Sequence, residues 1–209
     1  MYGRLAGYED TNDSARLRVD PSVRRIVGER AKKGVGALTS EMSRLETEIL
    51  ATDDNLANLS YVCGRWVNQV AARLPRKQVV LDMDSSESPT HGQQEGSAYN
   101  GHFGRTCYHP LFCFNQDGNV ERAMLRHGNV HSADDWRSVL EPVVSRYRDK
   151  SLERFFRGDA AFANPEMYEF LETEQFFYAI RLKDNNLLHQ HIVLISPPGL
   201  WDVPRSSRR

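Results

Sequence analysis

QVVLDMD, residues 78–84, is the stretch of sequence that decides the fold. Its β-branched and long apolar residues predict a short strand, and that strand ends in two acids, Asp82 and Asp84. Because side chains alternate across a strand, the two carboxylates are expected on the same face. Their spacing alone does not choose between them, so both are candidate functional acids at the carboxyl end of this strand.

The segments that follow predict a loop and then a β-hairpin. Residues 85–104 are polar and contain four glycines, which indicates a long loop. Two aromatic and apolar runs, 107–114 and 120–125, flank the turn signal Asp117-Gly118. We therefore expect the strand at 78–84 to be followed by a hairpin of two more strands.

Helices and strands then alternate. Residues 132–135 predict a helix N-cap before an apolar stripe, and Pro142 inside that stripe predicts a kink or an early break. Residues 152–157 predict a strand, Asn164-Pro165 opens a helix that runs to about residue 172, and 176–182 predict a last strand. A β meander followed by alternating helices and strands is the order of an α/β, RNase H-like mixed sheet.

The part before this sheet is predicted to be helical. Residues 38–49 have one amphipathic helical face, and a second helix is expected from about 54 to 74. This helix pair is either a DNA-binding unit or a packing layer. The expected organisation is a helical N-terminal region at 1–76, a partial RNase H-like domain at 77–188 and an irregular tail at 189–209.

Composition limits the function classes without choosing one. There are 27 Lys and Arg residues against 28 Asp and Glu residues, so the chain as a whole lacks the basic excess of a nucleic-acid binder. Residues 16–33, which include Arg24 and Arg25, and residues 205–209 are locally basic, and each cluster either contacts phosphates or forms a solvated surface. Three cysteines without C-x-x-C spacing, no long apolar run and no signal-peptide pattern predict a soluble cytoplasmic protein with no membrane association.

The acids at predicted strand ends could carry metal-dependent chemistry. Asp84 ends the strand at 78–84, and Asp159 ends the strand at 152–157. Two carboxylates brought together this way can hold Mg²⁺, which prefers oxygen ligands, and a pair of such ions can promote attack on a phosphodiester. The plainer interpretation is that each Asp only forms a turn or caps a helix.

Several motifs in the same order are more specific than this placement. The chain contains GYED at 7–10, LDMDSS at 81–86, HGQQEG at 91–96, YHPL at 108–111 and RGDAAF at 157–162. This sequence resembles bacterial insertion-sequence transposases of the DDE group-one type, from about residue 2 to about residue 185. LDMDSS resembles their first acidic block, and RGDAAF resembles their second.

The resemblance implies a role for particular residues. It makes Asp84 the first catalytic acid, with Asp82 as the fallback, and Asp159 the second; these three would be the ligands of Mg²⁺ or Mn²⁺. The implied partner is the DNA of transposon ends, and the implied chemistry is DNA cleavage and strand transfer. The candidate DNA contacts are Arg157, His91, Arg24 and Arg25, although His91 could instead order its loop.

One departure from the family pattern changes the expectation for this chain. Family members carry a third acid, a Glu, on a helix well beyond the second block, whereas Glu166, Glu169, Glu172 and Glu174 come too early. From about His189 the text no longer resembles the family, so we expect a truncated copy, altered by a frameshift or premature stop, with little strand-transfer activity. The alternatives are a non-enzymatic remnant that binds DNA, dimerises or pairs with intact transposase, and an RNase H-like nuclease whose last acid comes from elsewhere.

Overall fold

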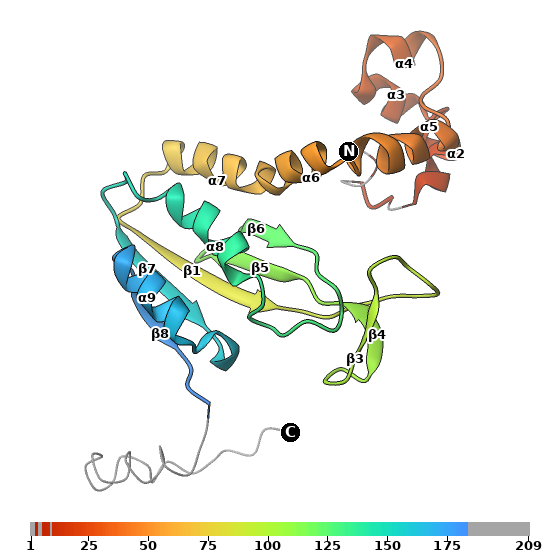
Figure 1. The fold of residues 1–209 in the computed structure, drawn as a ribbon. Helices are drawn as coiled ribbons and strands as arrows, with labels where there is room; N and C mark the ends of the chain where they lie inside the picture. Colours follow the sequence, from red (N-terminus) through yellow and green to blue (C-terminus); the bar gives the residue numbers. More distant parts are fainter. Residues whose placement is uncertain (1–2, 4–5, 9, 184–209) are drawn as a thin grey trace, which may run out of the picture. The chain divides into compact units, whose positions relative to one another are not determined.

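The structure is a computed structural model, and it describes residue 3, residues 6–8 and residues 10–183 (Figure 1). The chain divides into two compact units, Met1–Val62 and Cys63–Arg209. The predicted boundary near residue 76 marks the change from helices to strands, whereas the compact units divide earlier. The predicted tail at 189–209 lies outside the described residues.

The first unit is helical, as the sequence predicts for this part of the chain. Its elements are η1 (Thr11–Asp13), α2 (Ser14–Leu17), α3 (Pro21–Val27), α4 (Glu29–Lys33), α5 (Thr39–Arg44), the π-helix η2 (Leu45–Leu50) and α6 (Asp53–Ser60). Asp20 begins α3, because its carboxylate accepts the main-chain N–H groups of Ser22 and Val23 and Pro21 follows it. The helix expected at 38–49 is therefore present as α5 and η2.

The helix predicted at 54–74 is two helices rather than one. It divides at Tyr61 into α6 and α7 (Val62–Arg73), and all but the first residue of α7 belong to the second unit. Within that unit α7 is attached by hydrogen bonds, since Arg146 donates to the carbonyl of Gly64 at 2.7 Å and Lys150 donates to Asn68 at 3.0 Å. A Cβ on Gly64 would overlap the Arg146 guanidinium, so a larger residue there would make Arg146 shift.

A mixed sheet of five strands forms the centre of residues 78–180. The strands are β1 (Gln78–Ser85), β5 (Leu111–Asn115), β6 (Val120–Met124), β7 (Glu153–Gly158) and β8 (Phe177–Ile180). Their order is β6-β5-β1-β7-β8, with β1 antiparallel to β5 and parallel to β7, and β7 parallel to β8. This order, an antiparallel meander continued by two parallel strands, confirms the predicted RNase H-like sheet.

One face of this sheet carries the hydrophobic core. Val79, Leu81 and Met83 of β1 alternate into it, and they pack with the buried faces of α8 (Trp136–Ser145) and α9 (Pro165–Thr173). Figure 1 shows both helices lying along the sheet. In chain order α8 connects β6 to β7, and α9 connects β7 to β8. Since the alternate residues of β1 face away from this core, Asp82 and Asp84 lie on the opposite, open face.

The stretch expected to be a loop contains a small second sheet. β2 (Ser88–Pro89), β4 (Arg105–Tyr108) and β3 (Ala98–Asn100) pair in that order, so Cys107 belongs to β4 and not to the hairpin. The sequence missed these strands because each is short and none alternates clearly. The buried Asn100 holds the sheet in place by donating to the carbonyl of Gly128.

The start and the interior of α8 differ from the prediction. The helix begins at Trp136 and its N-cap is Asp135, with a φ of 57°, not Ser132. Arg126 explains this start, because its guanidinium binds the carbonyls of His131, Ser132 and Asp134 and holds that segment as a turn. Of the two outcomes expected at Pro142, the early break is wrong, since α8 continues to Ser145, and the kink stays a prediction.

Burial explains why α8 tolerates its proline. An interior proline removes one helical hydrogen bond, and here the carbonyl that loses its partner is that of Ser138, an exposed residue that water can reach. Val139, Leu140, Val143 and Val144, on both sides of Pro142, are buried in the core. Their packing offsets the cost of the proline, about 3 kcal/mol.

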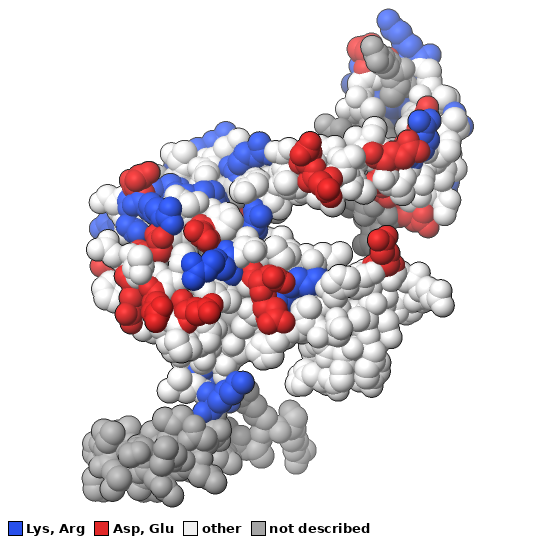
Figure 2. All heavy atoms as spheres, in the orientation of Figure 1, with Lys and Arg blue, Asp and Glu red and all other residues white. Residues whose placement is uncertain are grey.

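In the part of the chain that the structure describes, the helices are too short or too polar to cross a bilayer. In Figure 2 positive and negative side chains intermingle over the larger sheet and its helices, whereas the small sheet presents a face with few charges. This face of the molecule therefore has no extended surface of a single sign.

Candidate metal-binding site at the ends of β1 and β7

The parallel pairing of β1 and β7 brings the two predicted acids together. The register runs from Gln78 opposite Glu153 to Met83 opposite Gly158. Asp84 is the next residue of β1 and Asp159 directly follows the last residue of β7, where it keeps an extended backbone, with φ −77° and ψ −176°. The backbone positions of the two aspartates are therefore neighbours at the carboxyl ends of β1 and β7.

Asp84 and Asp159 are exposed and only lightly hydrogen-bonded. Asp84 Oδ1 accepts the main-chain N–H of Ser85 at 2.8 Å, and Asp159 Oδ1 accepts that of Ala161 at 2.9 Å. Among the described residues, the Oδ2 atom of each has no hydrogen-bond donor. Each carboxylate therefore keeps lone pairs that face solvent.

Asp82 has different surroundings, although it shares the face of Asp84. Its cross-strand partner on β7 is Arg157. The guanidinium forms a two-pronged ion pair with it, Nε to Oδ1 at 2.6 Å and an Nη atom to Oδ2 at 2.5 Å. This hydrogen bonding, followed by the Coulomb attraction of Asp82, raises the pKa of Arg157 above its ordinary value. Of the two acids that the sequence left open, Asp84 is the one with free oxygens.

The donor set fits a hard divalent cation only in part. Two adjacent carboxylates with free oxygens are the ligands that Mg²⁺ and Mn²⁺ accept, with water completing the shell. Within the described residues no group of three His, Cys, Asp or Glu side chains is arranged to hold a metal ion. Glu166, Glu169, Glu172 and Glu174 lie on or just after α9, and none of them joins the two aspartates in such a group.

The other predicted contacts lie outside this pair. His91 is exposed in the segment between β2 and β3, and no hydrogen bond among the described residues links it to Asp84 or Asp159. Arg24 and Arg25 lie on α3 in the first unit, where Arg24 donates to the carbonyl of Lys32 at 2.7 Å. These three residues remain predicted DNA contacts.

Sequence analysis missed a buried carboxylate, Glu121 of β6. Its side chain is 0% exposed, and it accepts hydrogen bonds from Asn115 at 2.9 Å, from the Tyr147 hydroxyl at 2.8 Å and from Arg146. Burial, and then the Glu121 charge, raise the pKa of Tyr147 above its ordinary value. The sequence signal was a charged residue inside an apolar strand, which alone does not say whether the residue is buried.

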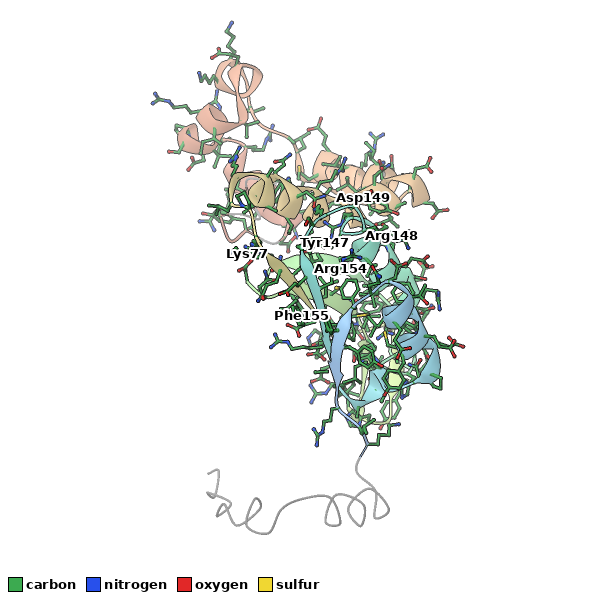
Figure 3. All side chains as sticks on the ribbon, turned by 90° about the vertical axis from the view of Figure 1, so that its left-hand side faces the viewer. Lys77, Tyr147, Arg148, Asp149, Arg154 and Phe155 are labelled. Atoms are coloured by element: carbon green, nitrogen blue, oxygen red, sulfur yellow. The ribbon has the colours of Figure 1, made fainter. Side chains whose placement is uncertain are left out.

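A groove lies at the other end of the sheet, away from the aspartates. Its volume is about 870 Å³, and its walls are mainly apolar residues of α7, such as Trp66 and Val70, and the beginning of β1. Figure 3 looks toward this end and labels Lys77 before β1, Tyr147 after α8 and Arg154 on β7. The groove contains neither Asp84 nor Asp159, so it is separate from the candidate metal site.

Comparison with solved structures gives distant likenesses. The chain is similar to the Mos1 transposase in a paired-end complex with the left transposon end, at 13% identity and a TM-score of 0.32, covering 81% of this chain and 59% of that one. A second is the Drosophila P element transposase in its strand transfer complex, at 11% identity and a TM-score of 0.30, covering 86% and 48%. The chain therefore spans 59% of the length of the Mos1 transposase and 48% of the length of the P element transposase.

Comparison with protein-family models, unlike comparison with curated proteins, identifies the family of the chain. No curated protein matches the chain. The family model described as transposase DDE domain group 1 matches residues 1–199, beyond His189, where we expected the likeness to end. That match includes the two acidic blocks, the whole of the first compact unit and the second unit as far as residue 199. The chain belongs to the transposase DDE domain group 1 family.

Proposed function

We propose that this chain forms the metal site of a transposase that cuts and joins DNA, with Asp84 and Asp159 as the ligands of Mg²⁺ or Mn²⁺. The observation that supports the proposal is the pairing of β1 with β7, which sets two exposed carboxylates side by side. Bound divalent cations would activate the attacking hydroxyl and stabilise the leaving oxygen of a phosphodiester. Asp84 and Asp159 contribute negative oxygens that attract and orient these cations, and the hydrogen bonds from Ser85 and Ala161 orient the two carboxylates.

We further propose that the 209-residue chain alone binds these cations weakly and transfers strands poorly. Among the described residues no third His, Cys, Asp or Glu side chain joins the two carboxylates in a metal-binding group. Two like charges at one site repel each other when the cation is absent, and the missing third carboxylate lowers affinity further.

Manganese binding tests the proposal. The free Mn²⁺ signal in electron paramagnetic resonance would be titrated with the wild-type chain and with Asp84→Asn and Asp159→Asn. Each substitution should weaken binding at least tenfold, because the neutral amide gives up one of two charges. Asp149→Asn, an exposed acid labelled in Figure 3 on the turn after α8, is the matched control and should bind as the wild type does. Equal Mn²⁺ affinity in all four proteins would refute the site.

DNA contacts are proposed at Arg157, His91, Arg24 and Arg25. Retention of a 40-base-pair duplex in a gel should fall steeply as salt rises, because Lys and Arg contacts release counterions from the phosphates. Replacing Arg24 and Arg25 together by Gln should reduce the salt dependence. An unchanged slope in this double variant would remove α3 from the DNA contact surface.

A non-enzymatic role is the second candidate, and the gathering of only two carboxylates favours it. In this case the chain binds DNA, or pairs with a second copy or with full-length transposase, without cutting. Plasmid nicking in Mn²⁺ separates the two candidates. Nicking that disappears in both Asp84→Asn and Asp159→Asn supports the catalytic proposal, and salt-dependent DNA retention without nicking supports the non-enzymatic one.

A further inference from the structure

Four side chains form a square on the open face of β1 and β7. Asp82 and Asp84 are two residues apart on β1, and on the neighbouring strand β7 Arg157 is followed two residues later by Asp159, just past the end of the strand. Positions two apart on a strand are separated by about 6.6 Å, and neighbouring strands by about 4.8 Å. Three carboxylates and one guanidinium therefore lie near one another at this end of the two strands, and as they stand the three acids do not form a metal-binding group.

Within residues 10–183, Arg157 is the cation that pairs with Asp82. The other cross-strand neighbour of Asp82 is Phe114, and that of Arg157 is Ala179, both uncharged. The guanidinium occupies both oxygens of Asp82 with its two-pronged contact. Asp82 is thereby turned to its partner along the same row of the sheet, and both of its oxygens already accept from Arg157.

This ion pair adds little to folding. The Arg157 side chain is 61% exposed and that of Asp82 is 29% exposed. Ion pairs that solvent reaches this freely contribute at most about 1 kcal/mol to stability. The ion pair is relevant to cation binding because of its position. It precedes Asp84 and Asp159 by two residues on each of the two chain segments.

We propose that Arg157 is a positioning residue that holds Asp82 away from the metal and sets the charge of the site, an inference that rests on the proposed function. Removing Arg157 would release Asp82 as a third carboxylate and tighten cation binding. Removing Asp82 instead would leave an unpaired guanidinium beside the cation and weaken binding. The two single substitutions therefore act in opposite directions, whereas a purely structural pair would weaken binding in both.

Mn²⁺ titration of the wild type and four variants tests this sign pattern. Arg157→Gln should bind Mn²⁺ about tenfold more tightly than the wild type, and Asp82→Asn about tenfold more weakly, as expected for one unit charge at roughly 6 to 7 Å near a solvated surface. The double variant, in which both charges are absent, should return to within about threefold of the wild type. Arg157→Lys should also stay near the wild type, because it keeps the charge opposite Asp82.

The outcomes separate this inference from the proposed function. If Asp84→Asn abolishes Mn²⁺ binding but Arg157→Gln binds no more tightly than the wild type, Arg157 has no positioning role and the metal site stands. If neither the wild type nor Arg157→Gln binds Mn²⁺, both proposals are wrong. Urea unfolding of each variant at low metal concentration checks that affinity, and not folding, has changed.

Discussion

Glu121 on β6 and Asp159 after β7 are carboxylates of one sheet, yet their oxygens meet opposite surroundings. Glu121 is completely buried and receives hydrogen bonds from Asn115, Tyr147 and Arg146. Asp159 is exposed and receives one, from a main-chain N–H. Burying a charge costs several kcal/mol unless its partners are in place, so Glu121 acts within the fold, whereas Asp159 and its neighbour Asp84 remain available to a ligand.

The largest effect is expected where the network around Glu121 is broken. Glu121→Ala leaves the Arg146 guanidinium and the Tyr147 hydroxyl without their shared acceptor, which should lower the free energy of unfolding by about 3 to 5 kcal/mol. Urea denaturation measures the loss. Glu169→Ala, on the exposed side of α9, is the control and should change stability by less than about 0.5 kcal/mol. If Glu121→Ala lowered the free energy of unfolding by less than about 1 kcal/mol, Glu121 would not be the stabilising residue that this comparison with Asp159 makes it.

The same network predicts an alkaline sensitivity. Because burial and Glu121 raise the pKa of Tyr147, the unfolded chain loses its phenolic proton first as the pH rises. The stabilisation is complete below the ordinary tyrosine pKa, about 10, and is lost as the pH rises toward the higher pKa of the folded state. Above pH 10 the free energy of unfolding should fall by up to about 1.4 kcal/mol per pH unit.

Tyr147→Phe should make this slope shallower in urea unfolding measured from pH 8 to pH 11. Some slope should remain, because burial also raises the pKa of the Cys113 thiol. Tyr99→Phe, at a side chain that is 64% exposed, is the matched control and should unfold with the wild-type slope. Identical slopes in the wild type and Tyr147→Phe would show that this hydroxyl is not held as the structure has it.

The smallest effect on stability is expected at the candidate metal site. Asp84→Asn keeps the shape of the side chain and an oxygen that can accept from Ser85, so its free energy of unfolding should stay within about 0.5 kcal/mol of the wild type. The same variant should lose Mn²⁺ binding. If it destabilised the fold as much as Glu121→Ala, Asp84 would be a structural residue and the comparison would fail.

Much of the sheet could be predicted because the deciding signals are local. The alternation in β1 placed Asp82 and Asp84 on one face, and Asp117-Gly118 predicted the hairpin of β5 and β6. Asn164 caps α9 by accepting from the N–H of Met167, as expected before Pro165. The small sheet of β2, β3 and β4 escaped prediction, since its short strands are held together by partners distant in sequence.

What the sequence by itself determined is therefore the strands and helices of the larger sheet and the position of Asp84 and Asp159 at strand ends, because periodicity and strand-end position are properties of short segments. Only the tertiary structure decided which of the two acids on β1 is paired, since Arg157 comes from a strand 75 residues away. The tertiary structure also decided that the side chain of Glu121 is buried. A register shift between Cys113 and Phe114 of β5 leaves Glu121 as the extra residue of β6, and such a bulge redirects a side chain, here into the protein interior.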